Sequence, residues 1–469
     1  MTTLVWLRRD LRLADHPALS AAAAEGPVVP VFVLDPETEA LGAASRWRLE
    51  AALAAFGEAL AARGSRLILR RGPAAETLLA LAQECGARAV RWTRAYAPAW
   101  VARDKAAKAA LKAAGLAAES CPGFLLHEPW TIRTGAGEPY KVFAPFWRAM
   151  AGRPAADPLP APDLRPPAAW PASDRLADWG LGAAMNRGAE AVARHAVVGE
   201  AAARARLDGF LDRIDRYATD RDRPDLPGCS GLSENLTWGE IAPAAVWRAA
   251  ERARQEVGRG AETFLKELAW REFAWSLLWF WPDMDRRNWR SEWDAFPWRG
   301  DNPEAERWRR GLTGEPMVDA GMRQMFVTGT MHNRVRMLTA SYLAKHLMTD
   351  WRVGLAWFED CLIDWDPASN ALGWQWTAGS GPDSAPFFRV FSPAAQAGRF
   401  DPDGAYRRRF VAGFEGSREA EALAFFEAAP RSWGLSPEDP LPEPVIPHAA
   451  GRARALAAYA DLRAGGEGG

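Results

Sequence analysis

The sequence predicts two domains of different class: an α/β domain with a doubly wound parallel sheet over residues 1–128, and an all-helical domain over residues 196–469. Three observations predict this division. Short apolar runs alternate with Ala-rich helical segments up to about residue 114. Seven prolines crowd residues 151–175, so that 129–195 is expected to be a long linker. From about residue 191 onward strand patterns end and amphipathic helical segments dominate.

The elements of the first domain alternate regularly along the chain. Mainly apolar runs predict buried strands at 4–7, 28–34, 67–69 and 89–92. Ala-rich or amphipathic segments predict helices at 17–25, 45–63, 74–84 and 100–114. No GxGxxG pattern follows the first strand, so the usual dinucleotide-binding fingerprint is absent. A parallel sheet covered by helices on both faces follows from this alternation.

Composition limits the class of protein and its compartment. The formal net charge is -1, with 48% apolar and 25% charged residues, so no global positive field is present. The four cysteines form no CxxC pair and no HExxH pattern occurs, which predicts reduced thiols and no metal. No run of 18 apolar residues predicts a membrane span. We expect a cytoplasmic protein that works as a monomer.

The most unusual segment is 364–376, which reads Asp-Trp-Asp-Pro-Ala-Ser-Asn-Ala-Leu-Gly-Trp-Gln-Trp. About one helix upstream, 331–337 reads Met-His-Asn-Arg-Val-Arg-Met. Acids, an amide and an Arg-rich helix face supply hydrogen bonds for a heterocycle, and indoles are easily oxidised. A plain helical core does not need this mixture. The combination predicts a flavin site.

Several segments together resemble the photolyase/cryptochrome family. These are 5–13 (Val-Trp-Leu-Arg-Arg-Asp-Leu-Arg-Leu), 217–222 followed by 229–233, 264–273, 331–337 and 364–376. The resemblance covers nearly the whole chain. It implies that the helical domain binds FAD. For an antenna chromophore, three possibilities remain open: a folate, a deazaflavin, or no antenna. Ala99 and Trp100 stand where folate-binding photolyases often carry an Asn-Glu pair, so that mode of folate binding is not supported.

The resemblance also implies which residues hold FAD. The 217–222 and 229–233 segments would cradle its phosphates, although Cys229 stands where the family usually has Thr. Arg336 would pair with Asp364, and Asn370 would face flavin N5, where photolyases typically have Asn and plant cryptochromes Asp. The full implied set is Tyr217, Cys229, Ser230, Gly231, Leu232, Ser233, Phe264, Glu267, Arg271, Asn333, Arg336, Asp364, Asp366 and Asn370.

Electron transfer and DNA contacts are assigned in the same way. Trp374, Trp351 and Trp298 match the family's tryptophan chain from flavin to surface, and with Glu267 and Asn370 they form the implied catalytic set. Glu267 would hydrogen-bond the base edge of a flipped pyrimidine dimer. The remaining residues implied to contact the lesion or the DNA phosphates are Trp270, Met337, Trp376, Arg221, Arg334, Arg389 and Arg399, with Arg389 in the signature 385–391.

The implied activity is light-driven repair of cyclobutane pyrimidine dimers in UV-damaged DNA by electron transfer from photoexcited reduced FAD. Repair of (6-4) photoproducts is disfavoured, because relatives with that activity use histidines where this chain has Asn333 and Met337. The alternative of another class is a blue-light photoreceptor, a cryptochrome without repair turnover. Thr330, where related photolyases often have Trp, keeps that alternative open. A generic flavin electron carrier is disfavoured by the lesion-pocket residues.

Overall fold

The computed structural model describes residues 1–383 and 388–466. Its N-terminal part contains one five-stranded parallel sheet with strand order β3-β2-β1-β4-β5. The strands are β1 (Thr3–Leu7), β2 (Val28–Leu34), β3 (Ile68–Arg71), β4 (Ala89–Thr93) and β5 (Ala117–Cys121). The predicted doubly wound α/β domain is therefore confirmed. Strand β5, at the sheet edge, has no counterpart among the predicted strands.

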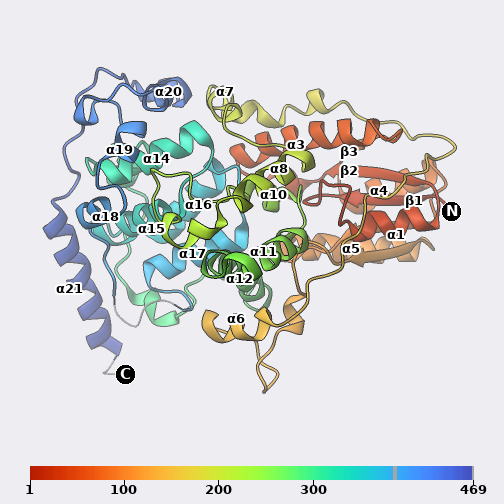
Figure 1. Ribbon diagram of the computed structural model, residues 1–469, viewed down its shortest axis with the longest axis horizontal. Coiled ribbons are helices and arrows are strands. Elements are labelled where there is room, and N and C mark those ends of the chain that lie inside the picture. Colours follow the sequence, from red (N-terminus) through yellow and green to blue (C-terminus); the bar gives the residue numbers. More distant parts are fainter. Residues whose placement is uncertain (384–387, 467–469) are drawn as a thin grey trace.

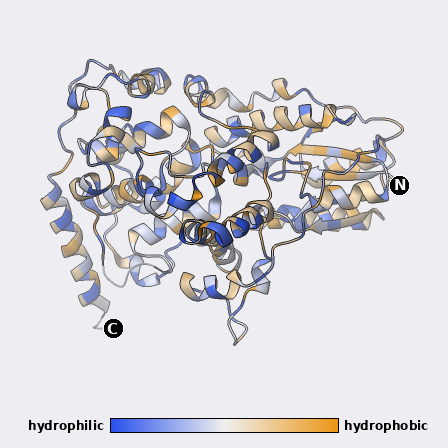
Figure 2. Cartoon of the chain, in the orientation of Figure 1, coloured by the Kyte–Doolittle hydropathy of each residue, from blue (hydrophilic) through white to orange (hydrophobic). Residues whose placement is uncertain are grey.

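Alternation along the strands explains why helices cover both faces. On one face, Val5 of β1 and Phe32 of β2 pack with α1 and α3, and on the other, Trp6 and Val31 pack with α4 and α5. Strands β1 and β2 are fully buried, and apart from Thr3 their residues are apolar. Much of these two arrows is orange in Figure 2. The helices are α1 (Pro17–Glu25), α2 (Pro36–Glu39), α3 (Ala43–Ala61), α4 (Ala74–Glu84) and α5 (Pro98–Ala113).

The C-terminal part is helical in all its described elements, as predicted. Helix α12 (Arg259–Phe280) lies at its centre and contacts α11, α9, α17 and α6. The other helices are α8 (Glu200–Leu211), α9 (Tyr217–Asp220), α10 (Ser233–Trp238), α11 (Pro243–Val257), α13 (Pro303–Arg309), α14 (Pro316–Thr328), α15 (Asn333–Ser341), α16 (Trp351–Cys361), α17 (Pro367–Ala378), α18 (Pro393–Phe400), α19 (Ala405–Phe410), α20 (Ala420–Ala428) and α21 (His448–Gly466). Helix α21 runs along the edge of the molecule farthest from the sheet (Figure 1).

The segment between the two parts is proline-rich and contains only short elements. They are η1 (Pro129–Thr131), α6 (Phe143–Ala151), η2 (Leu176–Trp179), η3 (Leu181–Met185) and α7 (Gly188–Ala193). Helix α6 contacts α12, and the yellow chain beyond it passes along the α/β domain to α7 (Figure 1). None of the helices within 1–383 and 388–466 has both the length and the apolar character of a membrane span.

Buried ion pairs connect the two parts of the chain. The guanidinium of Arg48, on α3, lies 3.0 Å from Glu234 and 2.6 Å from Glu240 of the helical domain, and all three side chains are almost fully excluded from solvent. Removing one partner of such a pair leaves an uncompensated buried charge, which costs about 3–5 kcal/mol. Because Glu234 lies in α10, these contacts also fix the turn that precedes α10.

Candidate functional site

Two adjoining cavities of about 310 and 780 Å³ lie in the helical domain. They are formed by the turn before α10 and by helices α12, α15 and α17, so elements far apart in the sequence meet there. Of the fourteen residues expected to bind FAD, twelve line the smaller cavity: Tyr217, Ser230, Leu232, Ser233, Phe264, Glu267, Arg271, Asn333, Arg336, Asp364, Asp366 and Asn370. The other two, Cys229 and Gly231, line the larger cavity.

The acid Asp364 is held by several donors at once. Arg336 Nη2 lies 2.9 and 2.7 Å from its two carboxylate oxygens, so the expected ion pair is present, and Ser233 Oγ donates at 2.7 Å. The Asp364 side chain is only 2% exposed. Arg336 is fixed in turn, because its Nε donates to the Met331 carbonyl at 2.7 Å. Together these bonds fix the polar floor of the cavity between α15 and α17.

The start of α17 orders the remaining polar groups. Asp366 caps this helix by accepting from the Ser369 amide at 2.8 Å, and its other oxygen accepts from Trp275 Nε1 at 2.9 Å. One turn later, Asn370 Nδ2 donates to the Leu355 carbonyl at 3.1 Å. For a ligand, Asn370 therefore keeps its carbonyl oxygen, an acceptor, and the second N–H of its amide.

The turn before α10 combines backbone amides with one thiol. Gly231 has φ +69°, a conformation that favours glycine, and Ser230 Oγ accepts from the Leu232 amide at 3.3 Å. Burial raises the pKa of Cys229 to about 11, so the thiol is neutral, and it donates to the Arg221 carbonyl at 3.6 Å. Its Sγ also lies 3.5 Å from His332 Nε2. Cys229 therefore makes protein contacts where the family's Thr would offer a hydroxyl.

The three tryptophans of the expected electron chain differ in their surroundings. Trp374 lines the smaller cavity, is 2% exposed, and has a buried Nε1 without a partner in the described chain. Trp351, on the adjacent helix α16, is fully buried and donates to Asn288 Oδ1 at 2.8 Å. Trp298 is half-buried and donates to the Trp293 carbonyl at 3.3 Å. Trp374 and Trp351 are thus both buried, and Trp298 is the one of the three that is partly exposed.

The residues expected to meet the lesion gather at the larger cavity. Glu267, Trp270, Met337 and Trp376 all line it. Trp270 stacks on Phe143 of α6, with ring centroids 3.8 Å apart and planes 8° from parallel. The sequence analysis missed Phe143, because it lies in the expected linker; the only local signal was the cluster of aromatic residues at 143–147.

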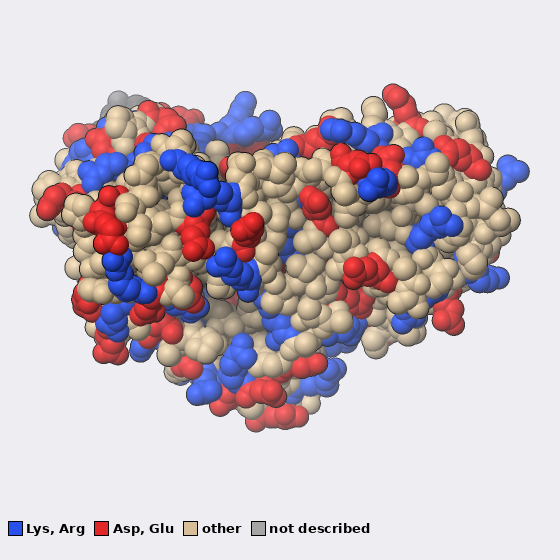
Figure 3. Space-filling model, turned by 90° about the horizontal axis from the view of Figure 1, so that it is seen from above, with Lys and Arg blue, Asp and Glu red and all other residues tan. Residues whose placement is uncertain are grey.

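The arginines expected to contact DNA phosphates fall into two groups. Arg221 and Arg334 line the larger cavity, whereas Arg389 and Arg399 are exposed and do not line either cavity. Residues 385–387 of the signature segment lie outside the described residues. On the face drawn in Figure 3, positive and negative side chains are interspersed among the residues shown. No field of one sign covers that face.

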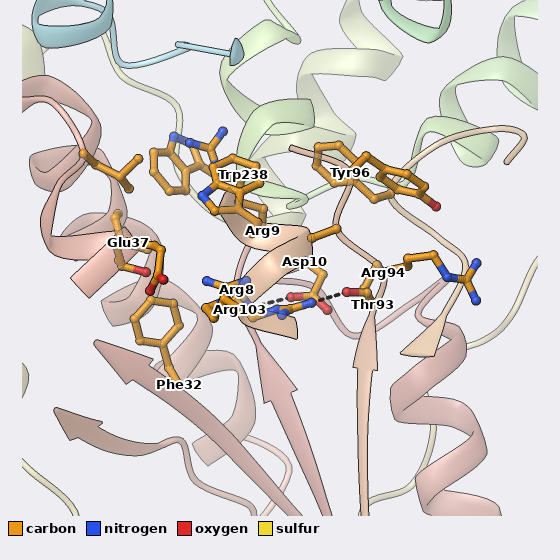
Figure 4. Close-up of a pocket in the computed structure, with 16 residues that line it drawn as sticks. Arg8, Arg9, Asp10, Phe32, Glu37, Thr93, Arg94, Tyr96, Arg103 and Trp238 are labelled. Atoms are coloured by element: carbon orange, nitrogen blue, oxygen red, sulfur yellow. Dashed lines mark hydrogen bonds between the residues drawn. The ribbon is translucent and has the colours of Figure 1, made fainter. Parts of the chain in front are cut away.

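A third, smaller cavity lies where the carboxyl ends of the strands meet the helical domain (Figure 4). Arg9 lies there over the rings of Trp100, Trp238 and Trp365, and burial lowers its pKa to about 10. The cavity measures about 50 Å³, well below the roughly 300–1,000 Å³ typical of sites for drug-sized ligands. The cavity is therefore smaller than a typical site for a molecule the size of a folate or a deazaflavin.

Comparisons with known proteins identify the family of the chain. Residues 3–163 match the family model described as DNA photolyase, and residues 264–461 match the model described as the FAD binding domain of DNA photolyase. A deoxyribodipyrimidine photo-lyase from Agrobacterium fabrum is 44% identical over 98% of both chains. Cryptochrome-2 of Arabidopsis thaliana is 34% identical, over 87% of this chain and 70% of that protein.

Solved structures give the same result. The crystal structure of a bacterial class III photolyase from Agrobacterium tumefaciens is similar with a TM-score of 0.91 at 44% identity, covering 98% of both chains. The structure of a cryptochrome from Synechocystis sp. PCC6803 has a TM-score of 0.84 at 26% identity, covering 97% of this chain and 98% of that one. The chain belongs to the DNA photolyase family and carries that family's FAD-binding domain.

Proposed function

We propose that the protein is a light-dependent deoxyribodipyrimidine photo-lyase that splits cyclobutane pyrimidine dimers in UV-damaged DNA. One observation carries this proposal: the polar residues suited to a flavin and the aromatic residues suited to a dimer line two cavities that share Glu267, Asn333 and Met337. Bound FAD supplies the light absorption and the electron that opens the dimer. The protein's part is to position both molecules and to exclude water from between them.

The residues of the smaller cavity fit FAD by their chemistry. The Asp364–Arg336 pair and the turn 229–233 offer fixed charges and backbone amides for the sugar and phosphates. Asn370 offers a carbonyl oxygen, which accepts a hydrogen bond without bringing charge. That is the partner suited to the protonated N5 of reduced flavin, and its neutrality favours the anionic reduced state that repair requires.

The larger cavity fits a dimer that has left the DNA stack. Enzymes that act on a base inside a duplex must first flip it out, since the reacting bonds are inaccessible there. Trp270 and Trp376 offer apolar walls, and Met337 offers a flexible contact. Glu267 offers a carboxylate for the N–H groups of the base edge. Arg221 and Arg334 would bind phosphates, with Arg389 and Arg399 at the outer rim.

The tryptophans suit photoreduction of oxidised FAD. An oxidised indole that has no proton acceptor passes its positive charge onward instead of losing its proton in place. Trp374 Nε1 is in that situation, whereas Trp298 is partly exposed to solvent and its Nε1 donates to the Trp293 carbonyl. We therefore propose that charge moves from Trp374 through Trp351 to Trp298.

The domain limits, compartment and assembly remain proposals as well. We propose boundaries near residues 128 and 196, supported by the proline-rich segment between them. Four free cysteines favour a reducing cytoplasm. We propose a monomer, since the cavities are formed within a single chain.

Incubation of the chemically reduced protein with dimer-containing duplex tests the function. Under blue light the duplex should become resistant to a dimer-specific endonuclease, and in the dark it should remain sensitive. Glu267→Ala should lower the repair yield per photon, whereas Glu262→Ala, on the same helix but with an exposed Lys266 partner, should not. Sensitivity that persists after illumination would favour the photoreceptor alternative, which the lesion-cavity residues disfavour.

A further inference from the structure

The two cavity arginines assigned to DNA phosphates are already paired with acids. Arg221 Nη1 donates to Glu267 Oε1, and Arg334 Nη2 lies 2.7 Å from Asp222 Oδ1. Asp222 Oδ1 also lies 3.9 Å from Arg221 Nε. The four groups therefore form a continuous row of alternating charge, Glu267–Arg221–Asp222–Arg334, that carries no net charge. Their side chains are 18–33% exposed, so DNA can reach them.

This pairing changes what each arginine offers to DNA. A phosphate attracts a free guanidinium, but beside Arg221 it would also meet the negative charge of Glu267. Arg334 is in the same situation beside Asp222, and its position is further fixed by the Phe400 ring, whose centroid lies 4.6 Å from its Cζ. In the free protein both arginines are therefore held back from the DNA backbone.

The two acids differ in what damaged DNA offers them. Glu267 lines the larger cavity, where a flipped dimer would bring base N–H donors within its reach, whereas Asp222 does not line that cavity. Undamaged duplex brings phosphates but no hydrogen-bond donor for Glu267. If Arg221 leaves Glu267 to bind a phosphate of undamaged duplex, the Glu267 carboxylate is therefore left without a partner. A dimer gives Glu267 a new partner, and Arg221 then binds the backbone with its full charge.

We propose that Glu267 makes damage recognition selective by withholding Arg221 from undamaged DNA, and that Asp222 restrains Arg334 on all DNA alike. This inference rests on the proposed function and deepens it. Glu267 contacts the lesion and also controls a phosphate contact, and Asp222 becomes a positioning residue of the DNA-binding surface. Phosphate binding by Arg221 and base binding by Glu267 then occur together.

Binding measured in the dark tests the proposal. The probe is a fluorescent duplex with one thymine dimer, compared with the same duplex undamaged, over a series of salt concentrations. Each phosphate contact steepens the dependence of log K on log salt by about 0.9. For the unmodified protein the dimer duplex should have the steeper slope, by about one contact, because only that complex releases Arg221.

Glu267→Gln keeps a hydrogen-bonding side chain but cannot form the ion pair. It should raise affinity for undamaged duplex by about three- to tenfold and steepen its salt slope by about 0.9, so that the two duplexes become alike in slope. Glu262→Gln makes the same change on α12, five residues away, in the exposed pair with Lys266. It should leave both slopes unchanged. Retained FAD absorbance verifies that each variant is folded.

Asp222→Asn distinguishes the restraint of Arg334, which acts on all DNA, from the restraint of Arg221, which acts on undamaged DNA. It should raise affinity for both duplexes to the same extent, so that the ratio between them is kept. The proposal is overturned if Glu267→Gln leaves the undamaged slope as it was, or if Asp222→Asn reduces the ratio as much as Glu267→Gln does. Failure of the proposed function would look different: the unmodified protein would bind both duplexes equally and repair neither.

Discussion

The Arg336–Asp364 pair gives the most quantitative prediction for the flavin cavity. Arg336→Met removes two hydrogen bonds to a carboxylate whose side chain is 2% exposed, and leaves that carboxylate with the Ser233 hydroxyl. Breaking a fully buried pair by removing one partner costs about 3–5 kcal/mol. Arg336 is 26% exposed, so water screens part of the interaction, and we expect about 2–4 kcal/mol.

Denaturant unfolding of the FAD-free protein, followed by tryptophan fluorescence, measures this loss as a lower midpoint of the helical-domain transition. Lys266→Met provides the matched control, because it also replaces a cation by Met, but in an exposed pair 2.7 Å from Glu262. It should cost less than about 1 kcal/mol. Arg336→Lys should fall between the two, since lysine keeps the charge near Asp364 but has no second nitrogen to donate to the Met331 carbonyl. If Arg336→Met and Lys266→Met cost the same, the pair does not hold the cavity floor.

Three further predictions concern the electron chain, its packing and pH. Trp374→Phe should slow photoreduction of oxidised FAD under blue light while leaving repair by chemically pre-reduced protein intact; unchanged photoreduction would remove Trp374 from the chain. Gly354→Ala should destabilise the protein by about 1–3 kcal/mol and lower its FAD content, because the new Cβ would lie 2.0 Å from the Trp374 ring. An unchanged melting temperature would contradict the close contact between α16 and α17. Burial raises the pKa of the Glu272 carboxyl from 4.5 to about 7, so the folded state binds the carboxyl proton more tightly than the unfolded state does. The free energy of unfolding should therefore fall as pH rises from about 4.5 to about 7, by up to about 3 kcal/mol. Denaturation midpoints at about pH 5 and about pH 8 measure that fall, and Glu272→Gln, which has no proton to lose, should reduce it by that amount.

The sequence was most informative where one local pattern decides the structure. The central strands are buried on both faces, so their composition alone predicts them. Strand β5 escaped prediction because Ala117–Cys121 forms the sheet edge, where alternating exposure leaves a short and weakly apolar pattern. Local pattern thus predicts central strands better than edge strands.

The site residues likewise include some that the sequence could predict and some that it could not. Asp364 and Arg336 could be paired from sequence through the family resemblance, and the structure contains that pair. Phe143 and Asp222 could not be found, because their roles depend on which distant residues they meet, Trp270 for the first and Arg334 for the second. Such contacts arise when segments far apart in the sequence pack together. They are properties of the tertiary structure that no local spacing encodes.

Direct observation of repair tests the central claim. The chemically reduced protein is mixed with an oligonucleotide that carries one thymine dimer per strand, and the absorbance of intact thymine is followed under blue light. We predict that this absorbance returns only under illumination and continues to rise after more dimers have been split than protein molecules are present. No return of thymine absorbance, from protein that retains FAD and binds the oligonucleotide, would contradict the repair function.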